Sequence, residues 1–318
     1  MEALGSLVNQ TLNRNLWEAL LVSNYMDEEV NQFCMSEHFI HIHTDEKSWS
    51  SKVLIGLQMA NGRIISFLED DDIFLPNKLE KVLNAFEETV DLTFFHDTHQ
   101  KIDSNGNPLL IVSKDHPLET TLTLEVDNVT PSSIRMIFRN HLFGPNSSNS
   151  ILKAALVGST EYLKRLAVGS DYFILVAALR YAGILAFDIE LLTKYRIHNL
   201  SSTNYGLESS EALEKTALNA VIDHSVGFDM VRGKAFDRVI MNHVFSSKLL
   251  FDILSRESRK SIVSDFVGYL KSDGLRNIAH SGLIFPLILT FILSKSLARK
   301  IYLLQRFRFL RQNHYLGD

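Results

Sequence analysis

This 318-residue chain has a single cysteine and no net positive charge. Its single cysteine, Cys34, excludes an internal disulfide and a cysteine-built zinc site, so carboxylates or histidines would have to hold any metal. A formal net charge of -5 provides no overall field to attract nucleic acid, and no nucleic-acid partner is expected. The first residues lack the basic patch and apolar run of a signal peptide, so we predict a cytoplasmic location.

Hydrophobic residues make up 46% of the chain, enough for one sizeable core and a smaller appendage. Apolar runs typical of strands alternate with helical patterns through the first part of the chain, which predicts an α/β fold. The expected strands cover residues 16–22, 38–43, 64–68, 91–96 and 184–187. The expected helices there cover residues 2–11, 54–60, 76–88 and 172–182, with an insertion or small hairpin region at 101–135.

The pattern changes beyond about residue 207, where helical spacing continues without intervening strands. Helices are expected within 212–222, 239–253 and 262–270. We therefore divide the chain into an α/β domain at 1–205 and a helical region at 206–318.

The expected strand at 64–68 runs directly into four acids, Glu69, Asp70, Asp71 and Asp72. Adjacent carboxylates raise one another's pKa unless cations meet them. Mg²⁺ and Mn²⁺ prefer oxygen ligands, and the ligand crevice of an open α/β sheet lies at the carboxyl ends of its strands. The run therefore predicts a site for a metal and a phosphate, and the alternative is a solvated acidic turn.

The stretch 57–80, which reads LQMANGRIISFLEDDDIFLPNKLE, resembles the central signature of family 2 glycosyltransferases. In that family a helix, an Ala-x-Gly turn, an apolar strand, an acidic DXD-type cluster and a Pro-x-Lys-Leu helix follow in this order. Residues 2–11, ending in Asn-Gln-Thr, are similar to the first helix of the family. The resemblance continues at 170–173 and 195–201, so it covers about residues 2 to 204.

The resemblance implies a GT-A fold and an enzyme that transfers a sugar from a nucleotide-diphosphate donor to an acceptor hydroxyl, most often with inversion. It implies that Asp71 contacts a divalent metal, Mg²⁺ or Mn²⁺, which stabilises the diphosphate as it leaves. Glu69 and Asp70 would lie near the ribose and the diphosphate, although aspartate is commoner than glutamate at position 69. Asp171 matches the general base that deprotonates the acceptor. The alternative for Asp171 is an acid at a helix N-terminus, and one side chain can fill both roles.

Four more residues fall at or near donor-binding positions of the family, and the contact at Asn24 is weakened or altered because the usual aspartate is missing. Arg196 and His198 fall in a segment that often lies close to the diphosphate, whereas packing against the sheet is the alternative for Arg196. Asn24, with Ser23, stands where the family usually has an aspartate that contacts the base. Lys52 stands near a basic position that the family often has before the next helix.

Two groups of histidines invite a metal interpretation. His41 and His43 share one face of an expected strand, near His38, but no third ligand is evident, so an exposed strand face is preferred. The sequence HDTH at 96–99 is likewise interpreted as a loop.

The first strand of the family, which should precede the helix at residue 2, is absent from this sequence. We interpret the absence as a reading frame that starts at an internal methionine, because a central strand without its neighbour exposes backbone groups. A catalytically inactive GT-A scaffold is the alternative, which the intact Asp71 and Asp171 oppose. A sugar nucleotidyltransferase is a further alternative, but it needs a glycine-rich basic loop that is not visible here.

The region 283–311 combines an apolar run with a series of cations. The run at 283–293 is shorter than the roughly 18 to 20 residues that span a bilayer, and Pro286 interrupts it. Apolar residues interleaved with lysine and arginine follow, which suits a helix lying at the cytoplasmic face of a membrane. From this we expect a lipid-linked or cell-surface glycan as the acceptor. The alternatives are a helical hairpin over the catalytic domain and a homodimer contact.

Overall fold

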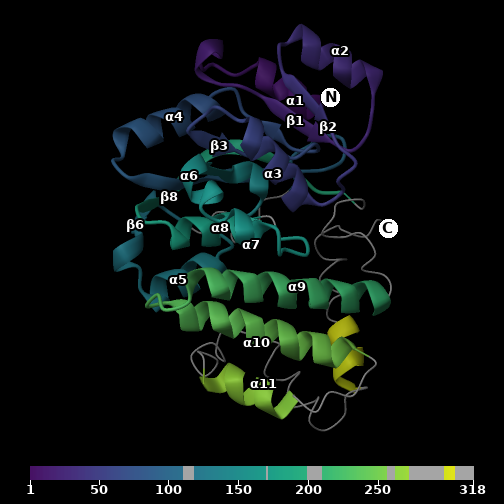
Figure 1. Ribbon diagram of the computed structural model, residues 1–318, viewed down its shortest axis with the longest axis vertical. Coiled ribbons are helices and arrows are strands. Elements are labelled where there is room, and N and C mark those ends of the chain that lie inside the picture. The colour runs from purple at the N-terminus through teal and green to yellow at the C-terminus, as the bar shows by residue number, and fades with distance from the viewer. Residues whose placement is uncertain (110–117, 170, 199–209, 256–261, 272–296, 305–318) are drawn as a thin grey trace. The chain divides into compact units, whose positions relative to one another are not determined.

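The computed structural model describes residues 1–109, 118–169, 171–198, 210–255, 262–271 and 297–304 (Figure 1). The chain forms two compact units, Met1–Arg196 and Ile197–Asp318, and each is described by itself. The predicted domain boundary at residue 205 falls outside the described residues and stays a prediction.

The first unit opens with a small layer of two helices, one 3-10 turn and two strands. In chain order these are α1 (Glu2–Val8), η1 (Arg14–Leu16), β1 (Leu20–Ser23), α2 (Glu28–Ser36) and β2 (Ile40–His43). β1 and β2 pair in parallel as a two-stranded sheet, and Cys34 is fully buried between α2 and this sheet. The predicted strand at 16–22 starts later than expected because Arg14–Leu16 turns first, with Asn13 capping the turn.

The main sheet has six strands in the order β3–β7–β5–β8–β4, with β6 also paired to β8. Their bounds are β3 Ile64–Ser66, β4 Ile73–Phe74, β5 Leu92–Ile102, β6 Leu122–Glu125, β7 Asn149–Leu152 and β8 Ile184–Arg196. Only β5 and β8 pair in parallel in this sheet, because β7 inserts antiparallel between β3 and β5, and β4 and β6 both run opposite to β8. The α/β class is confirmed, but the sheet is mixed rather than mostly parallel.

Helices flank the sheet of the first unit and bury its apolar faces (Figure 1). α8 is buried along its whole length from Tyr172 to Leu179, and Val82 and Phe86 of α4 pack on Leu92 and Phe95 of β5. The expected hairpin region at 101–135 contains β6 and also a helix, α5, which starts at a proline. The helices are α3 Trp49–Met59, α4 Lys78–Glu88, α5 Pro131–Arg139, α6 Lys153–Val157, α7 Thr160–Leu163 and α8 Asp171–Arg180, with 3-10 turns η2 Val126–Asn128 and η3 Asn146–Ser148.

The Asn-Gln-Thr end of the first predicted helix lies beyond α1 and fastens the segment after β4. Gln10 donates from Nε2 to the carbonyl of Leu75 at 2.9 Å and accepts from the amide of Leu79 at 2.9 Å. Thr11 donates from Oγ1 to Glu80 at 2.6 Å. These bonds hold the start of α4, which follows the acidic residues, against the N-terminal segment.

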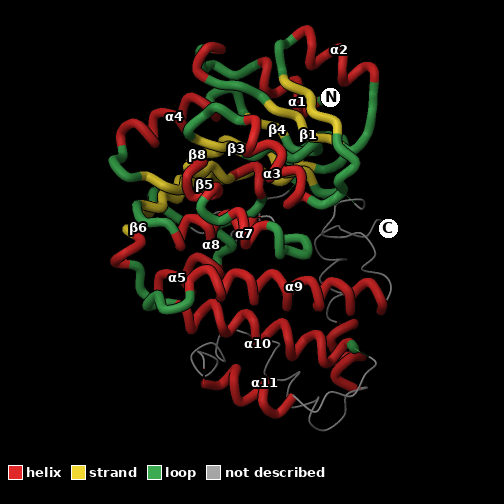
Figure 2. The backbone as a smooth tube through the Cα atoms, viewed as in Figure 1, coloured by secondary structure: helices red, strands yellow, loops and turns green. Residues whose placement is uncertain are grey.

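The described part of the second unit is helical, as predicted (Figure 2). α9 (Ser210–Val231) and α10 (Asp237–Leu254) lie side by side, and α11 (Ile262–Tyr269) packs on α10 through Leu249 and Tyr269. Leu213 and Ala217 of α9 meet Phe251 and Leu254 of α10 in an apolar seam. No helix in the described part of the chain has the length and apolar character needed to span a bilayer.

A short helical stretch at 297–304 is the described part of the predicted membrane-facing tail. Ala298 is fully buried against Ile253 of α10, whereas Leu297 and Leu304 are exposed. This stretch therefore packs one side on its own unit. The remaining residues of 283–311 lie outside the described residues, so their membrane contact stays a prediction.

Candidate active site

The four acids at 69–72, here called the acidic loop, connect β3 to β4 in the first unit. Asp70 and Asp71 form a tight turn, which the amide of Asp72 closes by donating to the carbonyl of Glu69 at 3.3 Å. Exposure is graded along the turn: Asp70 is exposed, Glu69 and Asp71 are half-buried, and Asp72 is fully buried. The loop thus presents carboxylates to solvent on one side and anchors itself in the protein on the other.

Glu69 is held by η3, a segment distant in sequence. Its backbone amide donates to Ser147 Oγ at 3.0 Å, and its Oε1 accepts from Asn146 Nδ2 at 2.6 Å. Burial raises the pKa of Glu69, and the carboxylates of Asp71, Asp70 and Asp171 raise it further. Asp171 therefore lies within electrostatic reach of the acidic loop.

Asp72 forms the buried base of the loop. Burial raises its pKa to about 7, with smaller contributions in the same direction from Asp71 and Glu69, while Ser147 and the amide of Arg196 act against them. The Arg196 amide donates to Asp72 Oδ1 at 2.9 Å. Asp72 thus ties the loop to the end of β8.

Asp171 is the first residue of α8. Its Oδ1 accepts from the amide of Tyr172 at 2.8 Å, so it occupies the helix N-terminus that the sequence offered as its alternative role. Burial raises the pKa of Asp171, which makes its carboxylate a stronger base than that of an exposed aspartate. The side chain lies against Gly144, where an added Cβ would come within 2.7 Å of Asp171 Oδ2. Glycine at 144 is what leaves room for this carboxylate.

Arg196, at the end of β8, bonds to protein groups. Its Nε donates to the carbonyl of Asp71 at 2.8 Å, one terminal nitrogen donates to the carbonyls of Asp103 and Ser104, and the other pairs with Glu2. These contacts tie the end of β8 to the backbone of the acidic loop. The predicted contact of Arg196 with a diphosphate stays a prediction.

The end of β1 approaches the loop from the two-stranded sheet. Lys52 of α3 donates to Asn24 Oδ1 at 2.7 Å, so the structure brings these two predicted residues together. Tyr25 follows Asn24, and its pKa is raised by burial and by the charge of Asp70, which places its phenol near the acidic loop. The base-binding role of Asn24 and the donor-binding role of Lys52 stay predictions, as does the role of His198, a half-buried residue that follows β8.

The histidine interpretations need correction in part, although His43 is exposed as expected. His41 does not lie on an exposed face: its half-buried ring bonds to Asn31 Oδ1 through Nδ1 at 2.5 Å and to Ser23 Oγ through Nε2 at 2.8 Å. It ties α2 to both strands of the small sheet. The residues at 96–99 lie inside β5 rather than in a loop, and buried His96 bonds to Asn149 Oδ1 at 2.8 Å.

The acidic loop is where a divalent metal fits the side chains present. Among the described residues, no group of three or more His, Cys, Asp or Glu side chains is arranged to hold a metal by itself. Mg²⁺ bound together with phosphate typically uses one or two carboxylates and completes its shell with water and substrate. Asp71 and Asp70, whose charges already raise the pKa of Glu69, offer such a partial set. The assignment of the metal to Asp71 stays a prediction.

Comparison with known proteins bears on the family. The sequence model for "Glycosyl transferase family 2" matches residues 2–142, a range that contains the acidic loop. Residues 2–142 thus have the sequence of a family 2 glycosyltransferase domain. An uncharacterized glycosyltransferase of Methanocaldococcus jannaschii is 26% identical over 218 residues, which cover 64% of this chain and 69% of that protein. An uncharacterized glycosyltransferase of Rickettsia bellii is 29% identical over 113 residues, which cover 34% of this chain and only 16% of that protein.

Solved structures bear on the fold. Residues 1–349 of S. aureus TarS superpose with a TM-score of 0.60 at 12% identity, covering 96% of this chain and 86% of that one. A likeness at this identity concerns fold alone. It confirms the expected GT-A fold with a helical C-terminal region.

Sequence reasoning missed several residues around the loop: Tyr25, Lys78, Asp97, Asn146 and Ser147. Tyr25 carried a usable signal, because it follows directly on the end of a strand next to two predicted residues. Lys78 was visible only as part of the Pro-x-Lys-Leu helix. Asn146 and Ser147 carried no pattern, since they act through a turn brought in from far along the chain.

Proposed function

We propose that the chain is an inverting, metal-dependent glycosyltransferase that moves a sugar from a nucleotide-diphosphate donor to an acceptor hydroxyl. The observation that supports the proposal is that Asp171, at the start of α8, lies close enough to the acidic loop for its charge to raise the pKa of Glu69. Two acidic functions, one for the donor and one for the acceptor, thereby share one site in a domain of the glycosyltransferase family.

The residues of the chain divide the work as follows. Asp70 and Asp71 would hold a divalent cation at the donor, and the cation would supply positive charge to the departing diphosphate. Asp171 accepts the proton of the acceptor hydroxyl as its oxygen attacks the anomeric carbon on the face opposite the leaving diphosphate. The raised pKa of Asp171 makes its carboxylate a stronger base for that step.

The acceptor, a lipid-linked or cell-surface glycan, remains a proposal that depends on the tail at 283–311. The peripheral membrane contact, the cytoplasmic location and a homodimer belong to the same proposal. The match covers only 16% of the length of the R. bellii relative and 26% of a second uncharacterized glycosyltransferase, from Rickettsia felis. The remaining parts of those proteins have no counterpart in the match.

Calorimetric titration of UDP and of GDP, each with and without Mn²⁺, tests the donor site. We expect binding of one nucleotide that requires Mn²⁺ and is lost in Asp71→Asn, which removes a charge while keeping the shape of the side chain. Glu87→Gln is the matched control, since it removes one charge from an exposed position of α4 in the same unit. If neither nucleotide binds the unaltered chain under any condition, the proposal is wrong and an inactive scaffold is favoured.

A further inference from the structure

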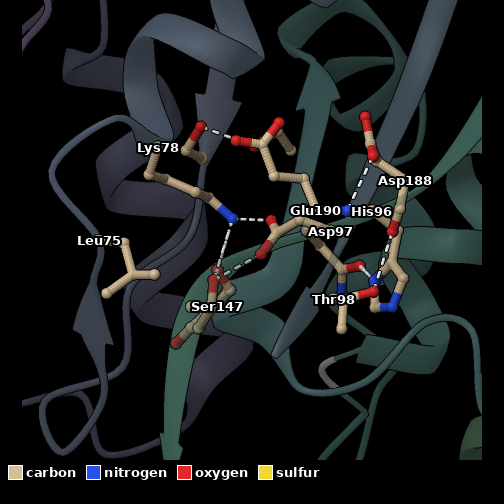
Figure 3. Close-up of polar contacts among 12 residues, drawn as sticks. Leu75, Lys78, His96, Asp97, Thr98, Ser147, Asp188 and Glu190 are labelled. Atoms are coloured by element: carbon tan, nitrogen blue, oxygen red, sulfur yellow. Dashed lines mark hydrogen bonds and ion pairs between the residues drawn. The ribbon is translucent and has the colours of Figure 1, made fainter. Parts of the chain in front are cut away.

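Lys78, the first residue of α4, is fully buried beneath the acidic loop, and so is its partner Asp97 of β5. The ammonium has three acceptors: Asp97 Oδ1 in an ion pair and the carbonyl of Ser147 at 3.1 Å (Figure 3), and also Thr193 Oγ1 at 3.2 Å. Three acceptors match the three N–H donors of an ammonium group. Lys78 is therefore satisfied as a cation although no water reaches it.

The partners of Lys78 are themselves joined. Thr193 Oγ1 lies 2.7 Å from Asp97 Oδ2, so both carboxylate oxygens of Asp97 have a partner. Lys78, Asp97 and Thr193 come from α4, β5 and β8, and Ser147 comes from η3. We call these four residues the buried network. It joins four segments that are distant in sequence at one point below the loop.

The buried network reaches the acidic loop through Ser147. The carbonyl of Ser147 accepts from Lys78, while its hydroxyl accepts from the amide of Glu69 at 3.0 Å. The neighbouring Asn146 binds the Glu69 carboxylate at 2.6 Å. The place of η3 thus sets the place of Glu69, and Glu69 begins the turn that presents Asp70 and Asp71.

Lys78 also interacts electrostatically with the acidic loop. Burial lowers the pKa of Lys78, and the carboxylate of Asp72, at the base of the loop, acts in the opposite direction, so Lys78 lies within electrostatic reach of the loop. Among the described residues Lys78 is the one cation with no exposed surface. A buried ion pair alone is weak evidence of a stabilising role, because apolar or neutral replacements of similar volume often stabilise a fold as well. Stability alone therefore does not explain a buried lysine at this position.

We propose that Lys78 is a positioning residue for the acidic loop: its ammonium holds the Ser147 carbonyl, and η3 in turn holds Glu69 where Asp70 and Asp71 can serve the donor and its cation. The inference rests on the proposed function for the identity of the ligand. It adds a role for a residue that touches neither donor nor acceptor.

The decisive variant is the double substitution Lys78→Met with Asp97→Asn, which removes both charges at similar volume. Lys78→Met alone leaves Asp97 as an unpaired buried charge and should unfold at a much lower temperature than the unaltered chain. The double variant should regain most of that temperature. If Lys78 positions the loop, the regained fold should still bind the Mn²⁺–nucleotide pair roughly 10- to 100-fold more weakly, the range typical of groups that orient metal ligands.

Hydrogen exchange of the Glu69 amide supplies a reading that needs no ligand. We expect faster exchange in the double variant and in Ser147→Ala, which removes the acceptor of that amide. Ser159→Ala is the matched control, because Ser159 is equally buried and its hydroxyl makes no hydrogen bond to a described residue. The control should leave both the exchange and the nucleotide affinity unchanged.

A folded double variant with unaltered affinity and unaltered Glu69 exchange would overturn the proposal and leave Lys78 a purely structural residue. If the unaltered chain binds no nucleotide, the proposed function fails instead, and Glu69 exchange still decides whether Lys78 holds the loop. The two failures are thus distinguishable.

Discussion

The two units bury their polar side chains in different ways. In the first unit, Lys78 and Asp97 bond to each other and to Ser147, which continues to the acidic loop. In the second unit, His224 of α9 bonds to Ser247 of α10 at 2.6 Å. A connected polar network fixes every group that it reaches, whereas a local bond satisfies only the groups that make it. Changes in the first network should therefore alter activity, and changes in the second unit should alter stability.

The largest difference in kcat between the two units should come from neutralising one buried acid in each. Asp171→Asn should lower kcat by roughly 100- to 10,000-fold because the acceptor proton loses its carboxylate. The fold should survive, since an asparagine oxygen can still accept from the Tyr172 amide at the start of α8. The measurement is the rate of nucleoside diphosphate release from the donor that calorimetry identifies.

The counterpart in the second unit is Asp252→Asn in α10, where the aspartate is almost fully buried. It should shift the unfolding temperature and leave kcat unchanged. An Asp171→Asn variant that keeps full activity would remove Asp171 from the mechanism, and an inactive but fully folded Asp252→Asn variant would contradict the comparison itself.

Substituting one glycine in each unit tests the same difference with smaller expected effects. Gly144→Ala places a Cβ 2.7 Å from Asp171 Oδ2 and should displace that carboxylate, and a shift of this kind can lower kcat by about 100-fold. Gly268→Ala in α11 places a Cβ 2.3 Å from the ring of Phe245 and should destabilise the second unit by about 1–3 kcal/mol through overpacking.

Kinetics and thermal unfolding of both glycine variants check this pair. Gly5→Ala is the control, because an added Cβ at residue 5 meets nothing within 4 Å. It should leave kcat alone and raise stability by about 0.5–1 kcal/mol as a helical glycine is replaced. Equal loss of activity in Gly144→Ala and Gly268→Ala would show that general destabilisation, not the place of Asp171, governs the rate.

The sequence predicted the acidic loop and Asp171 because each belongs to a motif that is local in the chain. It predicted the α/β class because apolar runs mark buried strands. The polar halves of β5 and β8 were missed, since the sequence Asp-Thr-His-Gln-Lys at 97–101 looks like a loop until a parallel partner supplies its hydrogen bonds. Pairing between distant segments, rather than propensity, decides such strands.

The site residues that the sequence did not predict were missed for the same physical reason. Ser147 is 78 residues from Glu69, and Asp97 is 19 residues from Lys78, so no spacing rule connects them. Asn149–Leu152 is only four residues long and half polar, yet as β7 it inserts antiparallel between β3 and β5. Contacts of this kind arise from tertiary packing and leave no periodic trace.

The smallest expected effect concerns buried histidines, one in each unit. Burial lowers the pKa of His224 to about 3, with His243 adding to the shift, and burial lowers the pKa of His96 to about 4. Both lie below the usual value of 6.5, so each folded unit excludes a proton that its unfolded chain would bind. Stability should therefore be fully present above about pH 6.5 and should fall as the pH drops towards the folded pKa.

For one such group the loss approaches about 1.4 kcal/mol per pH unit below the unfolded pKa. Urea unfolding of the second unit at pH 7.5, 6.5 and 5.5, in the unaltered chain and in His224→Gln, isolates this part, because glutamine does not titrate there. We expect the His224→Gln curve to be flatter over this interval, and His96→Gln to flatten the curve of the first unit alone. If His224→Gln leaves the pH dependence of the unfolding free energy of the second unit unchanged, His224 is not buried in its neutral form. Its bond to Ser247 then does not isolate it from water. If His96→Gln flattens both units together, their unfolding is coupled, and the contrast between a connected site and a separate helical unit would apply to function but not to stability.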